Sequence, residues 1–314
     1  MKNYNFLEKL LHDLLLSNKL IKKSLFEIEK IFFLQKNEEL LNKSHVFITG
    51  LPRSGSTALL YFLYDTSEFS SLTYENMPFV MAPNLFSKIR SKKKYEKNQR
   101  LHNDGIFYDL ESPEAFDEIF FSTYEESDLK KELENYLSII FINKKKRYLS
   151  KNNLNYKRIN CIANILPNSK FLITFREPLQ HAFSLYNQHL NFTKLQNNNS
   201  FIKRYMNYLG HNEFGINHRS WNNSIIYKDF NNLNYWIEQW ILFYENILYK
   251  YKNYKNCYFI KYEKLQDPKY NKNILQILEL STKPKFNLKV SEKKLNINFD
   301  EKLYLRARKI YESL

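Results

Sequence analysis

Apolar residues recur along the first part of the chain at three- and four-residue steps, the spacing of an amphipathic helix. This pattern predicts helix over residues 4–41, with a break at Asn18. Three short apolar runs follow at residues 45–49, 171–175 and 257–262, and their lengths are typical of buried strands. Because helical patterns separate these runs, we expect an α/β fold with a parallel sheet covered on both faces.

The segments between the predicted strands show where the helices lie. Helical spacing is present in six segments: residues 56–64, 129–142, 179–190, 235–251, 271–280 and 300–313. We expect a further strand at Ser71–Tyr74 and an Asn-rich loop over residues 191–200. The sequence contains no internal repeat, which excludes a solenoid or propeller.

The composition is that of an ordinary globular protein. The 314 residues are 43% hydrophobic and 26% charged, enough for a sizeable core. Cys161 and Cys257 stand alone, so we expect reduced thiols, no disulfide framework and no bound metal. No apolar run reaches the roughly 18 residues of a membrane span, and the N-terminus is a poor signal peptide. We therefore expect a cytoplasmic protein.

The charge balance is the unusual feature. The 48 Lys and Arg residues against 33 Asp and Glu residues give a net charge of +15 at pH 7. Such a surplus is compatible with nucleic-acid binding. However, 38 of the 48 basic residues are Lys, and scattered lysine serves solubility equally well. An anionic small-molecule substrate suits the same charge, so we expect no nucleic-acid partner.

One loop between a predicted strand and a predicted helix carries a specific pattern. Gly50 and Gly55, two of only five glycines, have the G-x-x-x-x-G spacing of a phosphate-binding loop. In such a loop, backbone N–H groups and a helix N-terminus converge on one anion. Ser56 stands where a nucleoside triphosphatase has lysine, and Arg53 supplies a cation inside the loop instead. The loop therefore predicts a phosphate or sulfate site.

The same loop resembles a family motif. Pro-Arg-Ser-Gly-Ser-Thr after an apolar strand is similar to the 5′-phosphosulfate loop of the sulfotransferases that use 3′-phosphoadenosine 5′-phosphosulfate (PAPS). The resemblance implies a P-loop-type α/β fold. It also implies that the 5′-phosphosulfate is held by Arg53, Ser54, Gly55, Ser56 and Thr57.

A second segment resembles the 3′-phosphate motif of this family. Arg176 ends a predicted strand and is followed by Glu177, Pro178 and then Ser184. The carboxyl end of a parallel strand faces the crevice in which such sheets bind ligands. The resemblance implies that Arg176 and Ser184 bind the 3′-phosphate of the cofactor. The family usually has Asp between the Arg and the Pro, and Glu177 departs from that pattern.

Sulfuryl transfer needs positioned partners, cations at the leaving oxygen and a base for the acceptor proton. The stretch around Glu75 resembles the tyrosylprotein sulfotransferase branch, which implies that Glu75 is the base. His102 is the alternative, since other branches use histidine. The resemblance implies that Lys151, together with Arg53, acts as a catalytic cation, with Lys151 at the bridging oxygen. Tyr262, in a Tyr-Glu-x-Leu segment, is expected either to contact the cofactor or to be a core tyrosine.

The resemblance extends over residues 44–314, which we expect to form the sulfotransferase domain, with residues 1–43 as an N-terminal helical extension. Residues 109–116 and 211–215 resemble segments of bacterial sulfotransferase-like proteins and are expected to shape the acceptor site. The acceptor itself stays open between a small molecule, a carbohydrate, a lipid and a peptide that offers a hydroxyl or an amine. The oligomeric state is open as well.

Two other functions fit parts of the pattern. A P-loop nucleotide kinase shares the loop, but Ser56 replaces its lysine and no clear acidic strand end is present for Mg²⁺. A basic nucleic-acid-binding protein would use the surface charge, and its binding would fall steeply with salt.

Overall fold

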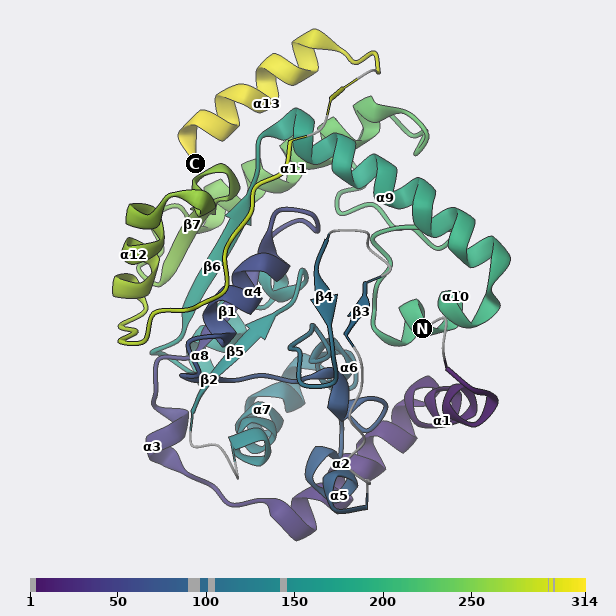
Figure 1. The fold of residues 1–314 in the computed structure, drawn as a ribbon, viewed down its shortest axis with the longest axis vertical. Helices are drawn as coiled ribbons and strands as arrows, with labels where there is room; N and C mark the ends of the chain where they lie inside the picture. Colours follow the sequence, from purple (N-terminus) through teal and green to yellow (C-terminus); the bar gives the residue numbers. More distant parts are fainter. Residues whose placement is uncertain (1–3, 90–96, 101–104, 142–145, 293, 296) are drawn as a thin grey trace.

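A parallel sheet of five strands forms the centre of the fold in the computed structural model (Figure 1). In spatial order the strands are β2 (Phe69–Ser70), β5 (Arg147–Lys151), β1 (Val46–Thr49), β6 (Lys170–Phe175) and β7 (Cys257–Lys261). The structure describes residues 4–89, 97–100, 105–141, 146–292, 294–295 and 297–314. The predicted α/β fold is confirmed, and β1, β6 and β7 lie where the apolar runs predict them.

The central strand β1 is buried along its whole length. Its Ile48 pairs with Lys151 on β5 on one side and with Leu172 on β6 on the other. Because the strands are parallel, the carboxyl ends of β1, β5 and β6 meet at the same edge of the sheet. The loop after Thr49, the Lys151 side chain and Arg176 therefore come to one place.

Side chains of β1 alternate between two apolar cores, as expected for a sheet covered on both faces. Phe47 belongs to the larger core, whereas Val46 and Ile48 belong to the smaller one. Helices α4 (Ser56–Tyr64) and α12 (Pro268–Ile277) contribute to the smaller core. The larger core receives side chains from α7 (Glu126–Phe141), α8 (Ile159–Ile165), α9 (Pro178–Asn198), α11 (Leu233–Tyr251) and α13 (Glu301–Ser313).

Short helices, turns and strands complete the fold. The helices among them are α5 (Pro83–Ile89), α6 (Glu118–Phe121) and α10 (Ser200–Tyr208). The 3₁₀ turns are η1 (Tyr74–Asn76), η2 (Asn155–Lys157) and η3 (Tyr262–Gln266). Strands β3 (Asn98–Gln99) and β4 (Phe107–Tyr108) form a separate antiparallel pair.

The strand predicted at Ser71–Tyr74 is wrong. The strand β2 ends at Ser70, and Tyr74 begins the 3₁₀ turn η1. Backbone N–H groups of Tyr74 and Glu75 donate to the carbonyls of Ser112 and Leu110, at 3.2 and 2.8 Å. This segment therefore satisfies its backbone against another loop instead of the sheet.

The loop predicted at residues 191–200 is also wrong, because α9 continues to Asn198. Its last turns have a buried side despite their Asn content. Phe192 lies in the larger core, and the buried Gln196 accepts from the backbone N–H of Ile216 at 2.7 Å. Tertiary contacts thus outweigh the weak helix propensity of asparagine.

The N-terminal helices pack on the rest of the fold. They are α1 (Phe6–Ser17), α2 (Lys19–Phe33) and α3 (Glu38–Leu41), and Asn18 separates the first two as predicted. The buried Glu29 carboxylate on α2 accepts from the backbone N–H groups of Asn84 and Leu85, at 2.8 and 3.0 Å. The division between residues 1–43 and 44–314 stays a prediction. Within the described part of the chain, no helix combines the length and apolar character that crossing a membrane requires.

Candidate functional site

The loop Gly50–Thr57 joins β1 to α4 and requires both of its glycines. Gly50 and Gly55 have φ values of 138° and 87°. A Cβ on Gly50 would lie 2.4 Å from the carbonyl oxygen of Thr174, and one on Gly55 would lie 2.4 Å from Cδ2 of Tyr262. Any side chain at either position would clash with its neighbour and strain the backbone.

The Ser54 side chain stabilises this loop from the inside. Its hydroxyl is fully buried and lies 2.7 Å from the carbonyl oxygen of Leu51 and 2.6 Å from the Thr174 hydroxyl. Both contacts lie within the protein. The Ser54 side chain thus holds the loop in shape, and the part of Ser54 in binding the 5′-phosphosulfate stays a prediction.

A buried histidine, His181 on α9, supports the loop from behind. The Trp240 indole donates to its Nδ1 at 3.1 Å, so the neutral ring carries its proton on Nε2 and donates to the Pro52 carbonyl at 2.8 Å. Burial, with smaller contributions from the charges of Arg176 and Arg53, lowers the pKa of His181 to about 3. His181 therefore stays neutral and acts as a structural donor.

Arg53 connects the two predicted binding motifs. Its backbone is left-handed, with φ at 72°, and its Nε donates to the Ser184 hydroxyl at 3.3 Å. Ser184 is buried on α9. The structure thus brings Arg53 and Ser184 together, although the chain separates them by 131 residues.

Tyr262 links the loop to Arg176. The Arg176 guanidinium lies over the Tyr262 ring, 4.5 Å from its centroid, and donates to the Ser291 carbonyl. The backbone N–H of Ser291 in turn donates to the Tyr262 hydroxyl at 3.0 Å. The tyrosine therefore contacts Gly55 on the loop and orients the arginine.

These groups border a large opening of about 1000 Å³, here called the main cleft. The predicted binding residues that line it are Arg53, Gly55, Ser56, Thr57, Arg176 and Tyr262. Ser54 and Ser184 do not line it. The aromatic rings of Tyr61, Tyr64 and Phe286 form part of its wall. The main cleft thus combines cations, a glycine-containing loop that leads into the N-terminus of α4 and flat aromatic surfaces, which suits an anionic nucleotide.

A second, smaller cavity of about 80 Å³ shares this loop with the main cleft, and we call it the inner pocket. Arg53, Ser56 and Thr57 line both cavities. The polar side chains of its wall are Tyr74, Arg100, Glu114, Lys151, Asn153, His211 and Glu213. Its apolar side chains include Phe116, Phe192, Met206 and Phe214. The shared loop residues place the inner pocket directly beside the candidate anion site.

Glu114 is the centre of an ion cluster in the inner pocket. It forms a buried ion pair with Arg100, its Oε1 lies 3.9 Å from Lys151 Nζ, and its Oε2 accepts from the Tyr74 hydroxyl at 3.1 Å. Burial acts to raise the pKa of Glu114, but the charges of Arg100 and Lys151 lower it to about 2. The carboxylate is therefore ionised and neutralised by two cations.

His211 and Glu213 form a second pair in this pocket. The Nδ1 of His211 lies 3.3 Å from both carboxylate oxygens of Glu213. The side-chain amide of Asn153 donates to Glu213 Oε1 at 3.1 Å. Burial acts to lower the pKa of His211, but the Glu213 charge and hydrogen bond outweigh it and raise that pKa. The same interaction overcomes burial at Glu213 and lowers its pKa to about 2.

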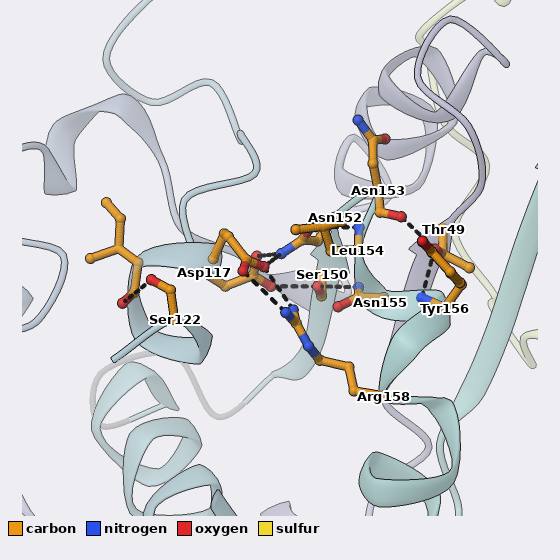
Figure 2. Close-up of polar contacts among 12 residues, drawn as sticks. Thr49, Asp117, Ser122, Ser150, Asn152, Asn153, Leu154, Asn155, Tyr156 and Arg158 are labelled. Carbon is orange, nitrogen blue, oxygen red and sulfur yellow. Dashed lines mark hydrogen bonds and ion pairs between the residues drawn. The ribbon is translucent and has the colours of Figure 1, made fainter. Parts of the chain in front are cut away.

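A polar network joins Asp117 to Ser150, near the end of β5, and to Asn152, just beyond that end (Figure 2). The buried Asp117 accepts from the Ser150 hydroxyl and, at 3.2 Å, from the Asn152 amide. Burial raises the pKa of Asp117 to about 6. The network fixes the backbone on both sides of Lys151, and it therefore fixes the direction in which that lysine leaves the sheet.

The same network reaches the end of β1. The Thr49 hydroxyl donates to the Asn153 carbonyl at 3.3 Å and accepts from the backbone N–H of Tyr156 at 3.0 Å, as Figure 2 shows. Arg158 binds both carboxylate oxygens of Glu118, at 2.8 and 3.1 Å. The loop after β1 and the wall of the inner pocket are thus parts of one connected structure.

Of the two predicted bases, Glu75 is not among the described residues that line either cavity. Glu75 is exposed on η1. Its charge, after burial and the charges of Glu111 and Asp109, contributes to a raised pKa of Tyr64, which lines the main cleft. Glu75 therefore lies near the rim of that cleft. His102 lies outside the described residues.

The inner pocket contains charged residues that sequence reasoning did not assign, namely Arg100, Glu114, His211 and Glu213. Glu114 lies within residues 109–116, and His211 and Glu213 lie within residues 211–215. These are the two stretches that the sequence predicts to shape the acceptor site. The structure brings both stretches to the inner pocket. Their partners are distant in sequence, as with Asn153 and Glu213, which are 60 residues apart, so no local spacing could reveal them.

Sequence comparison identifies a family for the catalytic core. The sequence model described as "Sulfotransferase family" matches residues 45–213, which is more than half of the chain. No protein of curated function gives a significant sequence match.

The fold is similar to that of a solved sulfotransferase. The crystal structure of sulfotransferase STF1 from Mycobacterium tuberculosis H37Rv aligns with a TM-score of 0.53 and 13% identity, over 88% of this chain and 78% of that one. Sulfotransferase STF9 from Mycobacterium avium aligns over 94% of this chain and 74% of its own, with 13% identity and a TM-score of 0.46. At this identity the STF1 alignment supports the fold and no finer property.

Proposed function

The chain belongs to the sulfotransferase family, and from this membership we propose that it transfers a sulfuryl group from PAPS to a hydroxyl or amine of an acceptor. One observation carries the proposal. Arg53, Ser56 and Thr57 lie on an anion-binding loop and line both the main cleft and the inner pocket. A sulfuryl group held by this loop would be accessible both from the main cleft, where the nucleotide would bind, and from the inner pocket, where the acceptor would bind.

The residues of the main cleft fit PAPS. Gly55 has no side chain and is the N-cap of α4, so backbone N–H groups of the loop and of the helix N-terminus would bind the 5′-phosphosulfate. Arg53, Ser56 and Thr57 would bind the same group. Arg176, oriented on the Tyr262 ring, would bind the 3′-phosphate, and a guanidinium suits that dianion.

In the structure, Ser184 has a contact that the sequence did not predict. Its hydroxyl contacts Arg53, and Ser184 is not among the described residues that line the main cleft. We therefore propose that Ser184 orients the guanidinium of Arg53, and its predicted contact with the 3′-phosphate stays a prediction.

The chemistry follows from the two cations at the junction. Bound PAPS supplies a sulfuryl group whose transfer leaves negative charge on the bridging oxygen. Lys151 enters from the end of β5 beside the loop, and together with Arg53 it would stabilise that charge. The acceptor would approach sulfur through the inner pocket, in line with the leaving oxygen, by analogy with phosphoryl transfer.

Several finer points of this account stay predictions. They are the acceptor, the tyrosylprotein branch, the cytoplasmic location, the absence of a nucleic-acid partner and Glu75 as the base. In the described part of the chain, no group of three His, Cys, Asp or Glu side chains is arranged to hold a metal ion. Independence from metal stays a prediction in the same way.

Turnover of labelled PAPS tests the proposed function. The protein is incubated with PAPS and a panel of phenol, carbohydrate, lipid and peptide acceptors, and 3′-phosphoadenosine 5′-phosphate (PAP) and sulfated product are measured together. We expect equal amounts of both with at least one acceptor class, without added metal. Mg²⁺-dependent turnover of ATP in place of PAPS would contradict the proposal and support a kinase.

A matched experiment addresses the nucleic-acid alternative. Binding to labelled DNA and RNA is measured from low to high salt, with and without PAP. Tight binding that falls steeply with salt and ignores PAP would support a nucleic-acid-binding protein. We expect only weak binding of the kind that scattered lysines produce.

A further inference from the structure

The His211–Glu213 pair has the geometry of an oriented base. His211 lines the inner pocket together with the loop residues Ser56 and Thr57. The carboxylate of Glu213 lies on the Nδ1 side of the imidazole, at 3.3 Å. A carboxylate at Nδ1 keeps the proton on that nitrogen, so the neutral ring presents an unprotonated Nε2. Nε2 can then accept a proton from a group inside the pocket.

Glu213 is itself held in place. The Asn153 amide donates to its Oε1 at 3.1 Å, and Asn153 lies two positions beyond Lys151 at the end of β5. The chain of contacts therefore runs from the sheet through Asn153 and Glu213 to the imidazole. The orientation of His211 is coupled to the same strand end that positions Lys151.

Other titratable groups of the inner pocket suit this task less well. The carboxylates of Glu114 and Glu213 have pKa values of about 2, so they are weak bases. Burial raises the pKa of Tyr74 and Tyr205 well above the usual value, so both phenols stay protonated. An imidazole has an ordinary pKa near 6.5 and is an efficient base close to neutral pH.

Resting on the proposed sulfuryl transfer, we propose that His211 is the base that takes the acceptor proton, with Glu213 as its positioning residue. The acceptor oxygen or nitrogen forms a bond to sulfur. The bond between sulfur and the bridging oxygen breaks, and its electron pair stays on the 5′-phosphate of the PAP product. The acceptor proton moves to Nε2 of His211 and is later released to solvent.

The surroundings of His211 set the direction of its pH dependence. Glu213 and Glu114 are negative and favour the imidazolium form, whereas Lys151 is positive and disfavours it. Arg100 partly neutralises Glu114. The net result is a raised pKa of His211, and activity should therefore rise with pH through a value above 6.5. Carboxylates have lower ordinary pKa values than imidazoles, so a carboxylate base would place this rise at lower pH.

The test combines binding, turnover and a direct reading of the imidazole. Binding of PAP is measured for the wild type, His211→Gln, Glu213→Gln and Glu75→Gln. PAP release from PAPS is followed against pH with water and with benzyl alcohol as acceptors. Histidine ¹⁵N spectra of the wild type give the tautomer and titration of His211, whose signals are identified by their loss in His211→Gln.

We expect all three variants to bind PAP within about threefold of the wild type, because none of the substituted side chains lines the main cleft. His211→Gln should lower PAP release by about 10²-fold or more and abolish its rise with pH. Glu213→Gln should shift that rise to lower pH, and Glu75→Gln should keep it in place. The spectra should show the proton of the neutral ring on Nδ1.

Failure of this inference is distinct from failure of the proposed function. If the wild type binds no PAP, the proposed sulfuryl transfer from PAPS is wrong. If PAP binds but the neutral ring carries its proton on Nε2, or if His211→Gln keeps the pH-dependent rise, then His211 is not the base. The spectra decide this point even if neither test acceptor is turned over.

Discussion

Gly55 lies directly against the ring of Tyr262: a Cβ on this glycine would stand 2.4 Å from Cδ2 of the tyrosine. The same ring carries the Arg176 guanidinium, 4.5 Å from its centroid. The Tyr262 ring therefore contacts both the loop and Arg176. The groups assigned to the two ends of the nucleotide are thus mechanically connected through one aromatic side chain.

This contact predicts the effect of Gly55→Ala. The methyl group must displace the loop or the Tyr262 ring, so PAP affinity should fall at least 10-fold, as measured by calorimetry. Gly105→Ala is the matched control, since Gly105 also lines the main cleft and has a similar positive φ of 75° but nothing within 4 Å of an added Cβ. If both variants bind PAP equally well, the contact between loop and ring is not required for donor binding.

Arg176 should determine recognition of the 3′-phosphate. Arg176→Ala removes the guanidinium from the main cleft, so PAP affinity should fall at least 10-fold while the weak affinity for AMP changes little. Arg204→Ala, on the surface in a pair with Asp13, serves as the control and should keep the PAP-to-AMP ratio. A proportional loss of both ligands in Arg176→Ala would assign the arginine to the shared part of the nucleotide instead.

Lys151 should affect turnover more than donor binding. It lines the inner pocket and not the main cleft, so Lys151→Met should keep PAP affinity within a few fold. The rate of PAPS turnover should fall by about 10²-fold, because a cation at the leaving oxygen is lost. Lys130→Met, exposed on α7, controls for the loss of one positive charge. A large loss of PAP affinity in Lys151→Met would contradict this assignment.

Glu114 makes stability depend on pH in a defined direction. Its pKa is about 2 in the folded protein against an ordinary 4.5, so its contribution is present above about pH 4.5 and is lost as the pH falls toward 2. This corresponds to stability on the order of 3 kcal/mol at neutral pH. Urea unfolding should show a large loss in Glu114→Gln at pH 7 and a smaller loss at pH 3. Glu39→Gln, exposed on α3, should change little, and an equal loss in Glu114→Gln at both pH values would refute the account.

Strands with dense apolar runs could be predicted from the sequence. Elements that depend on contacts with distant residues of the chain could not. β1, β6 and β7 are apolar throughout most of their length, whereas β5 ends in Ser150 and Lys151 and gives no such signal. The strand β2 has only two residues. The end of α9 has an unfavourable composition and depends on contacts such as that of Gln196 with Ile216.

The candidate site also has one part that could be predicted from the sequence and one part that could not. The anion loop is local, so its glycines, Arg53 and its hydroxyl residues could be identified from spacing alone. The inner pocket is assembled from seven separate stretches of the chain, and its pairs, such as Glu114 with Lys151, have no fixed sequence separation. Only the fold shows that an exposed Glu75 lies outside the two cavities while His211 lies inside one of them.

Binding of PAP tests the central claim most directly, since it needs no knowledge of the acceptor. The melting temperature is measured with PAP, AMP and ATP at equal concentrations. Saturating PAP should stabilise the protein by about 2.7 kcal/mol at 100 times its Kd, a shift of several degrees, and AMP and ATP should do far less. The absence of any shift at millimolar PAP, or an equal shift with ATP, would contradict the assignment of the main cleft to PAPS.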